Sequence, residues 1–394
     1  MGTLDGIRVL DLSRYIAGPT ASMMLADQGA DVVKVESAPV GDPSRQSGPY
    51  QDDHSVYFMS ANRNKRSIAL NLRNPASLEV IARLAADADV LIENFKPGTT
   101  AAMGIGPAQL AQTNPGLVYC SITGFGDGPI GSKMAGFDQN AQGMSGLMSV
   151  TGTAESGPLR TGVPISDSVT GLVASFGIVA KLMERERTGV GGLVTTSLME
   201  ASSFMLTYQA QKYLSLGIVP QRDGNDHPLL FPQGTFKAAD GYLTIASGNE
   251  TMWRKLCAAL GLDELADDPR YADNERRMAN RVALRERMEE RLAAHSAAHW
   301  IEYIGNAGVP CGEVLDVQGA FEHPVAKELQ LSETVRHSVL GDLRVLGRPA
   351  NTGDGAWLRL PPPLLGEHTE TILAELGYDE EARGRLADEG AITP

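Results

Sequence analysis

The sequence predicts an α/β fold in which helices cover both faces of a mostly parallel sheet. Short apolar runs typical of strands alternate with helical runs through the first third of the chain, and this alternation is typical of parallel sheets. Glycine and proline separate the runs, where turns and helix starts are expected. The length of 394 residues suggests two domains or three.

The first strand–helix–strand unit is expected near the N-terminus. An apolar run at 7–12 predicts a strand, and Pro19 lies where a helix favours its first residue. A helix over 21–28 is expected to end at Gly29, before a second strand at 31–36. The alternation continues with strands at 67–71, 89–93 and 117–123 and with helices at 75–86 and 107–113.

The pattern changes after residue 123. Residues 124–171 are rich in glycine, serine and proline and lack periodicity, so a long loop is expected. Loops of this length inside a compact domain are usually functional. A buried helix is predicted over 169–184, followed by a strand at 191–197 and a helix over 198–215.

The remaining part of the chain begins with a segment typical of a linker, because Pro, Gly, Asp and His predominate at 217–232. Asp240 and Gly241 predict the turn of a hairpin. Further helices are predicted where apolar residues recur at helical spacing. These residues are Trp253, Leu256, Cys257 and Leu260, and then Leu284, Met288 and Leu292. An acidic helix pair is expected from residue 367 onward.

The composition argues against several classes of partner. With 34 basic and 48 acidic residues the net charge is −14, which disfavours nucleic acid and anionic membranes because both are polyanions. The longest apolar stretch, 169–180, is too short to span a bilayer, and the N-terminus lacks a signal-peptide pattern. Three scattered cysteines favour a reducing compartment. We expect a soluble, cytoplasmic protein.

Several common site motifs are absent from the sequence. No P-loop occurs, and the glycines at 124–131 miss the spacing of a dinucleotide fingerprint. His295 and His299 lie four residues apart without the carboxylate of a zinc-binding motif, and no serine-hydrolase elbow is present. A metal site is therefore not expected.

A basic segment is the first candidate site. Residues 62–67 contain Arg63, Lys65 and Arg66 just before a predicted strand, and Lys34, Arg45, Arg73 and Lys96 also stand near predicted strand ends. The segment is either a solvated loop or a site for a phosphate-bearing ligand, since such ligands bind at strand ends and pair with cations.

Asp167 is the second candidate, because it stands where the glycine-rich loop meets the predicted apolar helix. It is either a helix N-cap, a position that Asp favours, or a carboxylate nucleophile beside a flexible loop. The helix dipole contributes only about 0.3–1 kcal/mol, so the sequence leaves both interpretations open.

Eight segments in the same order resemble the class III CoA-transferases, a family that includes formyl-CoA transferase and the carnitine and bile-acid CoA-transferases. The segments are 4–11, 18–19, 29–36, 64–68, 93–98, 121–126, 162–171 and 363–369. The resemblance implies CoA transfer from an acyl-CoA thioester to a free carboxylic acid, with Asp167 as nucleophile. It further implies an aspartyl anhydride and an aspartyl-CoA thioester as intermediates.

The resemblance also implies which residues contact CoA. These are Ile16, Leu70, Asn71, Arg73, Asn94, Phe95, Lys96, Phe137 and Asp138. Arg73 and Lys96 are expected near phosphate. Ser37 and Ala102 stand where the family often has basic residues, and the glycine-quartet loop of formyl-CoA transferase is absent. CoA is implied as a substrate, with no permanently bound cofactor.

The resemblance implies a large doubly wound, Rossmann-like α/β domain and a smaller α+β domain. The large domain would comprise 1–216 with 332–394 returning to it, and the small one 233–315, with linkers at 217–232 and 316–331. Two chains would interlock as a homodimer.

Two alternatives remain: an α-methylacyl-CoA racemase of the same superfamily, and a non-catalytic CoA-binding protein. The racemase needs a histidine where Phe137 stands, and a phenyl ring cannot exchange a proton.

Overall fold

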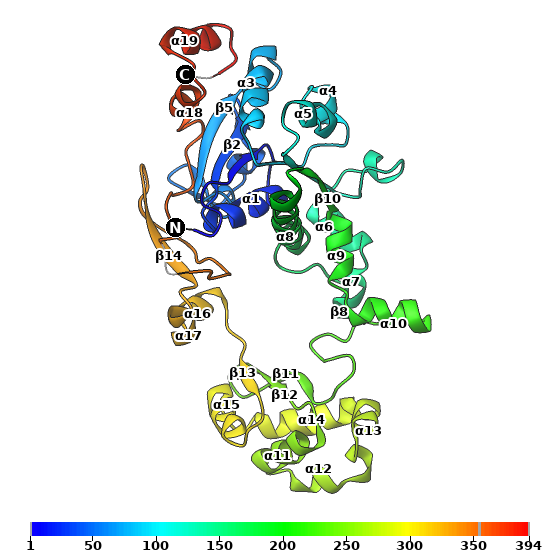
Figure 1. The fold of residues 1–394 in the computed structure, drawn as a ribbon. Helices are drawn as coiled ribbons and strands as arrows, with labels where there is room; N and C mark the ends of the chain where they lie inside the picture. The colour runs from blue at the N-terminus through cyan, green and yellow to red at the C-terminus, as the bar shows by residue number, and fades with distance from the viewer. Residues whose placement is uncertain (1, 354–355, 393–394) are drawn as a thin grey trace. The chain divides into compact units, whose positions relative to one another are not determined.

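The computed structural model describes residues 2–353 and 356–392 (Figure 1). These residues form two compact units. The first unit contains residues up to 147, 160–218 and the chain from 329 onward, and the second contains 148–159 and 219–328.

The first unit is built on a six-stranded sheet whose strand order is β10-β7-β6-β1-β2-β5. All five strand pairs in this sheet are parallel, which confirms the predicted α/β class and the central parallel sheet. In order across the sheet the strands are β10 (Gly192–Ser197), β7 (Val118–Thr123), β6 (Val90–Glu93), β1 (Arg8–Asp11), β2 (Asp31–Ser37) and β5 (Lys65–Leu70).

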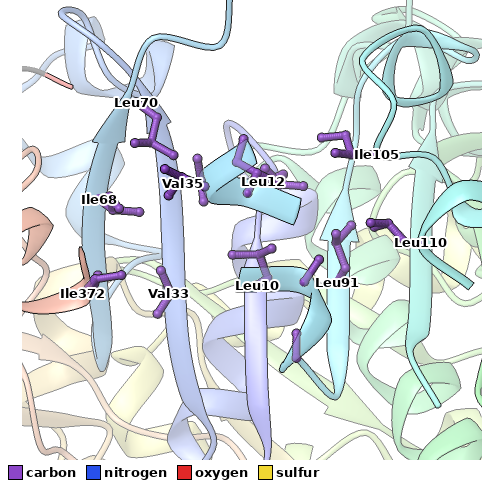
Figure 2. Packing of buried hydrophobic residues seen from close by; sticks show 14 of the residues in the cluster. Leu10, Leu12, Val33, Val35, Ile68, Leu70, Leu91, Ile105, Leu110 and Ile372 are labelled. Atoms are coloured by element: carbon purple, nitrogen blue, oxygen red, sulfur yellow. The ribbon is translucent and has the colours of Figure 1, made fainter. Parts of the chain in front are cut away.

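Successive residues of the strands are buried in different cores, because side chains alternate between the two faces of a sheet. Leu10, Val33 and Leu91 belong to one core (Figure 2), whereas Val9, Val32 and Val90 belong to the other. The first core is covered by α3 (Pro75–Ala86), α5 (Pro107–Thr113), α18 (Thr369–Glu375) and α19 (Glu380–Asp388). The second is covered by α1 (Ala17–Asp27), α6 (Asp138–Met144), α8 (Ile165–Thr188) and α9 (Leu198–Phe204).

Local signals account for several element boundaries. Pro75 opens α3 behind Asn74, whose side chain accepts the N–H of Ala76, and proline at the first position is favoured in helices. Gly29 has a φ of +111° after α1, a conformation that glycine adopts at little cost. Both α3 and α5 have the bounds that the sequence predicts.

The prediction of a long loop at 124–171 is partly wrong. Besides α6 it contains a short 3₁₀ turn (Gly131–Lys133), α7 (Leu147–Val150), β8 (Gly152–Thr153) and β9 (Gly157–Pro158), and α8 starts at Ile165. The predicted helix 198–215 is interrupted between α9 and α10 (Tyr208–Leu216), where Thr207 has a φ of +47°.

The helix α8 is only partly buried, contrary to the prediction. Thr170, Ala174 and Ile178 pack in the core, whereas Phe176 is 76% exposed and Met183 67% exposed. By length and composition alone α8 could cross a membrane. Its buried face, however, packs against the sheet of the first unit, as the core helix of an α/β domain does.

Shorter elements complete the first unit. They are a 3₁₀ turn (Pro43–Gln46), β3 (Tyr50–Gln51), β4 (His54–Ser55), α2 (Val56–Met59), α4 (Thr99–Ala102), β14 (Ser332–His337) and β15 (Gly341–Leu346). The last two form an antiparallel pair.

The second unit has a three-stranded antiparallel sheet with helices packed on it. Its strands are β11 (Gln233–Lys237), β12 (Tyr242–Ala246) and β13 (Cys311–Glu313). Its helices are α11 (Glu250–Leu260), α12 (Asp263–Asp267), α13 (Asn274–Ala279), α14 (Arg281–Leu292), α15 (Ala297–Asn306), α16 (Val317–Glu322) and α17 (Pro324–Glu328), with a 3₁₀ turn at Pro269–Tyr271. The predicted hairpin is β11–β12, and the apolar residues predicted on helices lie in this unit's core.

Candidate active site

The candidate site is a cavity of about 460 Å³ that contains Asp167 in its wall. Cavities of this size hold small ligands. It opens beside the carboxyl ends of β1 and β6, which are neighbours in the sheet although β2 and β5 lie between them in sequence. A crevice at such a switch in strand order is where α/β sheets bind ligands. Its charged and aromatic lining residues are Arg14, Tyr15, Tyr57, Phe95, Lys96, Phe137, Asp138, Arg160 and Asp167.

Asp167 occupies the first turn of α8, as its third residue. The N-cap is Pro164, and no side chain of the cap residue bonds to the helix, so the N-cap interpretation of Asp167 is wrong. Asp138 instead accepts the backbone N–H groups in the first turn of the helix. Its Oδ1 accepts from Ser166 at 2.8 Å and from Asp167 at 3.3 Å. This leaves the Asp167 carboxyl group free of a capping role.

The environment of Asp167 makes its carboxylate more basic than usual. Burial, together with the neighbouring Asp138 charge, raises its pKa to about 7. Burial and the Asp167 and Asp138 charges also raise the pKa of Tyr57 to about 12, so this tyrosine stays protonated. The site therefore combines a carboxylate that gains charge near neutral pH with a neutral hydroxyl group.

The turn after β1 is fixed by side chains from neighbouring strands. Asn94 accepts the N–H of Arg14 and donates to its carbonyl, both at 2.8 Å. Lys34 Nζ donates to the Ser13 carbonyl at 2.8 Å, and Asp42 Oδ1 accepts the Tyr15 N–H at 3.1 Å. Tyr15, at φ +62°, is thereby held with its ring edge-on to Phe137 at 6.3 Å between centroids.

Three cations of the cavity are available to a ligand. Within the described parts of the chain, no carboxylate lies within ion-pair distance of Arg14, Lys96 or Arg160. The Arg14 guanidinium lies over the Phe95 ring at 4.7 Å, and Arg160 donates to the Thr161 carbonyl at 3.2 Å. Such groups form charge-assisted hydrogen bonds with phosphate or carboxylate.

The sequence profile of CoA-transferase family III matches residues 4–369. The chain belongs to CoA-transferase family III. This result confirms the resemblance seen in the sequence.

Named relatives of this CoA-transferase act on different acids. The chain is 39% identical over 396 residues to the succinyl-CoA:glutarate CoA-transferase of Mus musculus, covering 100% of this chain and 91% of the relative. It is 39% identical over 325 residues to the acetyl-CoA:oxalate CoA-transferase of Acetobacter aceti, covering 82% and 83%. A CAIB/BAIF family protein from Brucella suis has a similar structure, with a TM-score of 0.86 and 38% identity over 95% of this chain and 99% of that one.

Five of the predicted CoA-contacting residues lie with Asp167 around the cavity of this CoA-transferase. They are Asn94, Phe95, Lys96, Phe137 and Asp138. Ile16, Leu70, Asn71 and Arg73 are not among the lining residues. The Leu70 side chain is fully buried in the sheet core, and Asn71 donates to the Gly390 carbonyl at 3.0 Å. Arg73 is exposed after β5.

Both interpretations of the basic segment are wrong for four of the seven cations named from the sequence, because these four form largely buried ion pairs, whereas Arg66 forms partly exposed pairs. Lys34 pairs with Asp42 at 2.9 Å and Lys65 with Asp11 at 3.1 Å. Arg45, Arg63 and Arg66 pair with Glu36, Asp27 and Asp31. A buried charge is costly unless it is paired, and neighbouring strand ends provide the partners. Of the cations named from the sequence, Arg73 and Lys96 form no ion pair with any described residue and remain candidate phosphate contacts.

Sequence reasoning missed Arg14, Tyr57 and Arg160 as members of the cavity. Arg14 lies three residues after the end of β1, and its position after a strand end was the signal that could have found it. Tyr57 and Arg160 come from segments without a motif. For a metal the site offers little: no cluster of three or more His, Cys, Asp or Glu able to hold an ion occurs in the described ranges 2–353 and 356–392.

Proposed function

We propose that this CoA-transferase moves CoA from an acyl-CoA to a free carboxylic acid through covalent chemistry on Asp167. The observation that carries the proposal is a carboxylate of raised pKa in the wall of a cavity that also contains cations with no acidic partner among the described residues. A basic carboxylate is a better nucleophile toward a thioester than an ordinary aspartate. The cations would bind the negative charges that CoA and the acid bring.

The steps balance without a cofactor. An Asp167 oxygen attacks the thioester carbonyl, a C–O bond forms, the C–S bond breaks, and CoA thiolate leaves a mixed anhydride. The thiolate attacks the Asp167 carbonyl carbon, which gives an aspartyl-CoA thioester and releases the first carboxylate. The acceptor carboxylate then attacks this thioester, which releases CoA thiolate and forms a second anhydride between Asp167 and the acceptor. The thiolate attacks the acceptor carbonyl of this anhydride. Free Asp167 and the new acyl-CoA result, with no net proton transfer.

Hydroxylamine tests the covalent steps. Enzyme mixed with acyl-CoA and hydroxylamine should acquire a hydroxamate on Asp167, detectable by peptide mass spectrometry. Asp167→Ala should lose at least about 10³-fold in kcat, since removing a covalent nucleophile abolishes its route. Full activity of Asp167→Ala would overturn the proposal.

We propose that CoA binds along the side of the cavity formed by the turns after β1 and β6. Asn94, Phe95, Lys96, Phe137 and Asp138 line this cavity, and Lys96 is the exposed cation suited to phosphate. The contacts proposed from the family resemblance also include Ile16, Leu70, Asn71 and Arg73. CoA enters as substrate, and no resident cofactor or metal is proposed.

The acceptor proposed is a dicarboxylic acid. Relatives are named for glutarate and for oxalate, and both acids carry a second carboxylate. Arg160 lies in the same cavity as Asp167 and has no acidic partner among the described residues, so its guanidinium can bind that second carboxylate.

Replacing Arg160 tests the acceptor class. Arg160→Gln should raise KM for glutarate about tenfold or more, the value of one charge-assisted hydrogen bond, and leave KM for a monocarboxylic acid within about twofold. Lys96→Gln is the matched variant, since it should raise KM for acyl-CoA and not for the acid. Equal effects of Arg160→Gln on both kinds of acid would contradict this assignment.

We further propose a cytoplasmic homodimer of interlocked chains that binds neither nucleic acid nor membranes. Exposed apolar side chains support self-association: Phe176 on α8, Phe204 on α9 and Leu214 on α10 all lie mostly in solvent, and large exposed apolar patches mark interfaces. The domain and linker boundaries expected from the sequence belong to this proposal. A stable monomer in light scattering would contradict the proposed homodimer.

A further inference from the structure

Gln142 is a buried amide without a role in the steps above. It lies on α6, one turn after Asp138, and its exposed fraction is 0%. Its Nε2 donates to Asp138 Oδ2 at 2.6 Å, and its Oε1 accepts the Thr161 N–H at 2.9 Å. Both ends of the amide are therefore used, and both partners belong to segments that line the candidate site.

Asp138 is held on both carboxylate oxygens. One oxygen accepts the N–H groups of Ser166 and Asp167 in the first turn of α8, and the other accepts from Gln142. Three donors fix a carboxylate far more tightly than the single contact of an ordinary cap. Asp138 thus links Gln142 to the backbone of the proposed nucleophile.

The second end of Gln142 holds the segment before α8. The Thr161 N–H donates to Gln142 Oε1 at 2.9 Å, and the Thr161 hydroxyl, which donates to the Val163 carbonyl at 2.9 Å, lies 3.3 Å from the same Oε1. Arg160 precedes this residue and donates to its carbonyl. One amide therefore joins the segment carrying Arg160, the Asp138 carboxylate and, through it, the start of α8.

We propose that Gln142 is a positioning residue of the CoA-transfer reaction, which holds Asp138 against the first turn of α8 and so fixes where the Asp167 carboxylate meets the thioester. This inference rests on the proposed function of Asp167. A buried glutamine that served packing alone would not need to meet two segments of the site with both ends of its amide.

The charged groups around Asp167 define how the inference can be measured. Asp138 faces it from α6, Tyr57 from α2, and Arg14, Lys96 and Arg160 from the turns around the cavity. Of these groups, Asp138 raises the pKa of Asp167, and the Asp167 charge in turn raises the pKa of Tyr57. Moving Asp138 should therefore change the pH at which Asp167 becomes charged.

Two variants of Gln142 should shift the acid limb of kcat/KM in opposite directions. Gln142→Met removes the amide at similar volume, so Asp138 loses the donor on Oδ2, is held less firmly beside Asp167, and the limb moves to lower pH. Gln142→Glu adds a carboxylate next to Asp138, so the limb moves to higher pH. We expect shifts of about half a pH unit, and kcat lower by tenfold to 100-fold with KM for acyl-CoA within about threefold.

Asn114→Ala is the matched control, because this amide donates to the Ala85 and Ala88 carbonyls away from the cavity. It should lower Tm without moving the pH profile. Wild-type pH profiles in both Gln142 variants, with folding verified by circular dichroism, would overturn the inference. If Asp167→Ala is inactive while the Gln142 variants have wild-type profiles, only this inference fails; if Asp167→Ala is active, the proposed function fails.

Discussion

Asp167 is the residue whose chemistry depends most on its surroundings. Burial and the Asp138 charge raise its pKa to about 7, so a large share of this carboxyl group is protonated in neutral solution. An aspartate at its usual value would be fully charged there, and a weaker nucleophile. The raised pKa also means that ionising the group opposes folding as pH rises, a cost typical of functional sites.

The pH profile of the free enzyme should follow this group. Acid protonates the nucleophile, so kcat/KM should fall about tenfold per pH unit below about pH 7, the value to which burial raises the pKa of Asp167. Steady-state rates between pH 5 and 9 check the prediction, with Asn114→Ala as a control of unchanged profile. A limb near pH 4 would contradict it.

At the scale of elements, much of the fold is predictable because the signals are local. The bounds of α3 and α5 follow from prolines and helical spacing within each segment. The start of α8 could not be found in this way, because Asp138, 28 residues before Ser166, accepts the N–H groups of the first turn of α8. A contact between two distant segments produces no periodic pattern of apolar residues in the sequence of either segment.

The basic segment shows the same limit on prediction. Its cations stand beside strand ends, as the sequence indicates, but their carboxylate partners lie elsewhere in the sequence, on other strands, on a helix or in a loop. Lys65 on β5 meets Asp11 on β1, and Lys34 on β2 meets Asp42 after it. Which strands are neighbours is decided by the whole sheet. A cluster of charges in one segment therefore could not distinguish a ligand site from buried ion pairs.

The Lys34 ion pair connects this buried network to the cavity. Lys34→Met leaves the buried Asp42 carboxylate without its cation and the Ser13 carbonyl without its donor, so we expect a loss of about 3–5 kcal/mol in the free energy of unfolding. KM for acyl-CoA should rise as well, since Asp42 also holds Tyr15. Urea denaturation and steady-state kinetics measure the two effects.

Arg8→Met is the matched control for that experiment. Arg8 is a largely exposed cation 3.8 Å from Asp87, and exposed pairs contribute at most about 1 kcal/mol. A loss in Lys34→Met no larger than in Arg8→Met would contradict the role given to the buried pair.

At the scale of the whole molecule, buried carboxylates should set the acid stability. Burial alone would raise the pKa of Asp11, Glu36 and Asp42, but the paired cations and hydrogen bonds hold all three below their ordinary values. The unfolded chain therefore takes up protons first as pH falls. Their stabilisation is complete above about pH 5 and is lost as pH falls further.

Urea unfolding at several pH values checks this prediction. The free energy of unfolding should fall between pH 5 and pH 3, by up to roughly 1.4 kcal/mol per pH unit for each of these carboxyl groups. Glu36→Gln, which removes one of them, should reduce the slope. A free energy that is constant over this range would contradict the prediction, because it would mean that folding does not lower the pKa of the three groups.

The C-terminal segment completes a core that the N-terminal segment begins. Ile372, Leu373, Leu386 and Ile392 pack with strands β1, β2 and β5, and the Ala391 carbonyl accepts the N–H of Asn71. During synthesis on the ribosome, the first strands therefore emerge long before the side chains that cover one of their faces. Most of the second unit is one continuous stretch, 219–328. It can therefore bury its own core before the residues at 372–392, which complete the core of the first unit, have been synthesised.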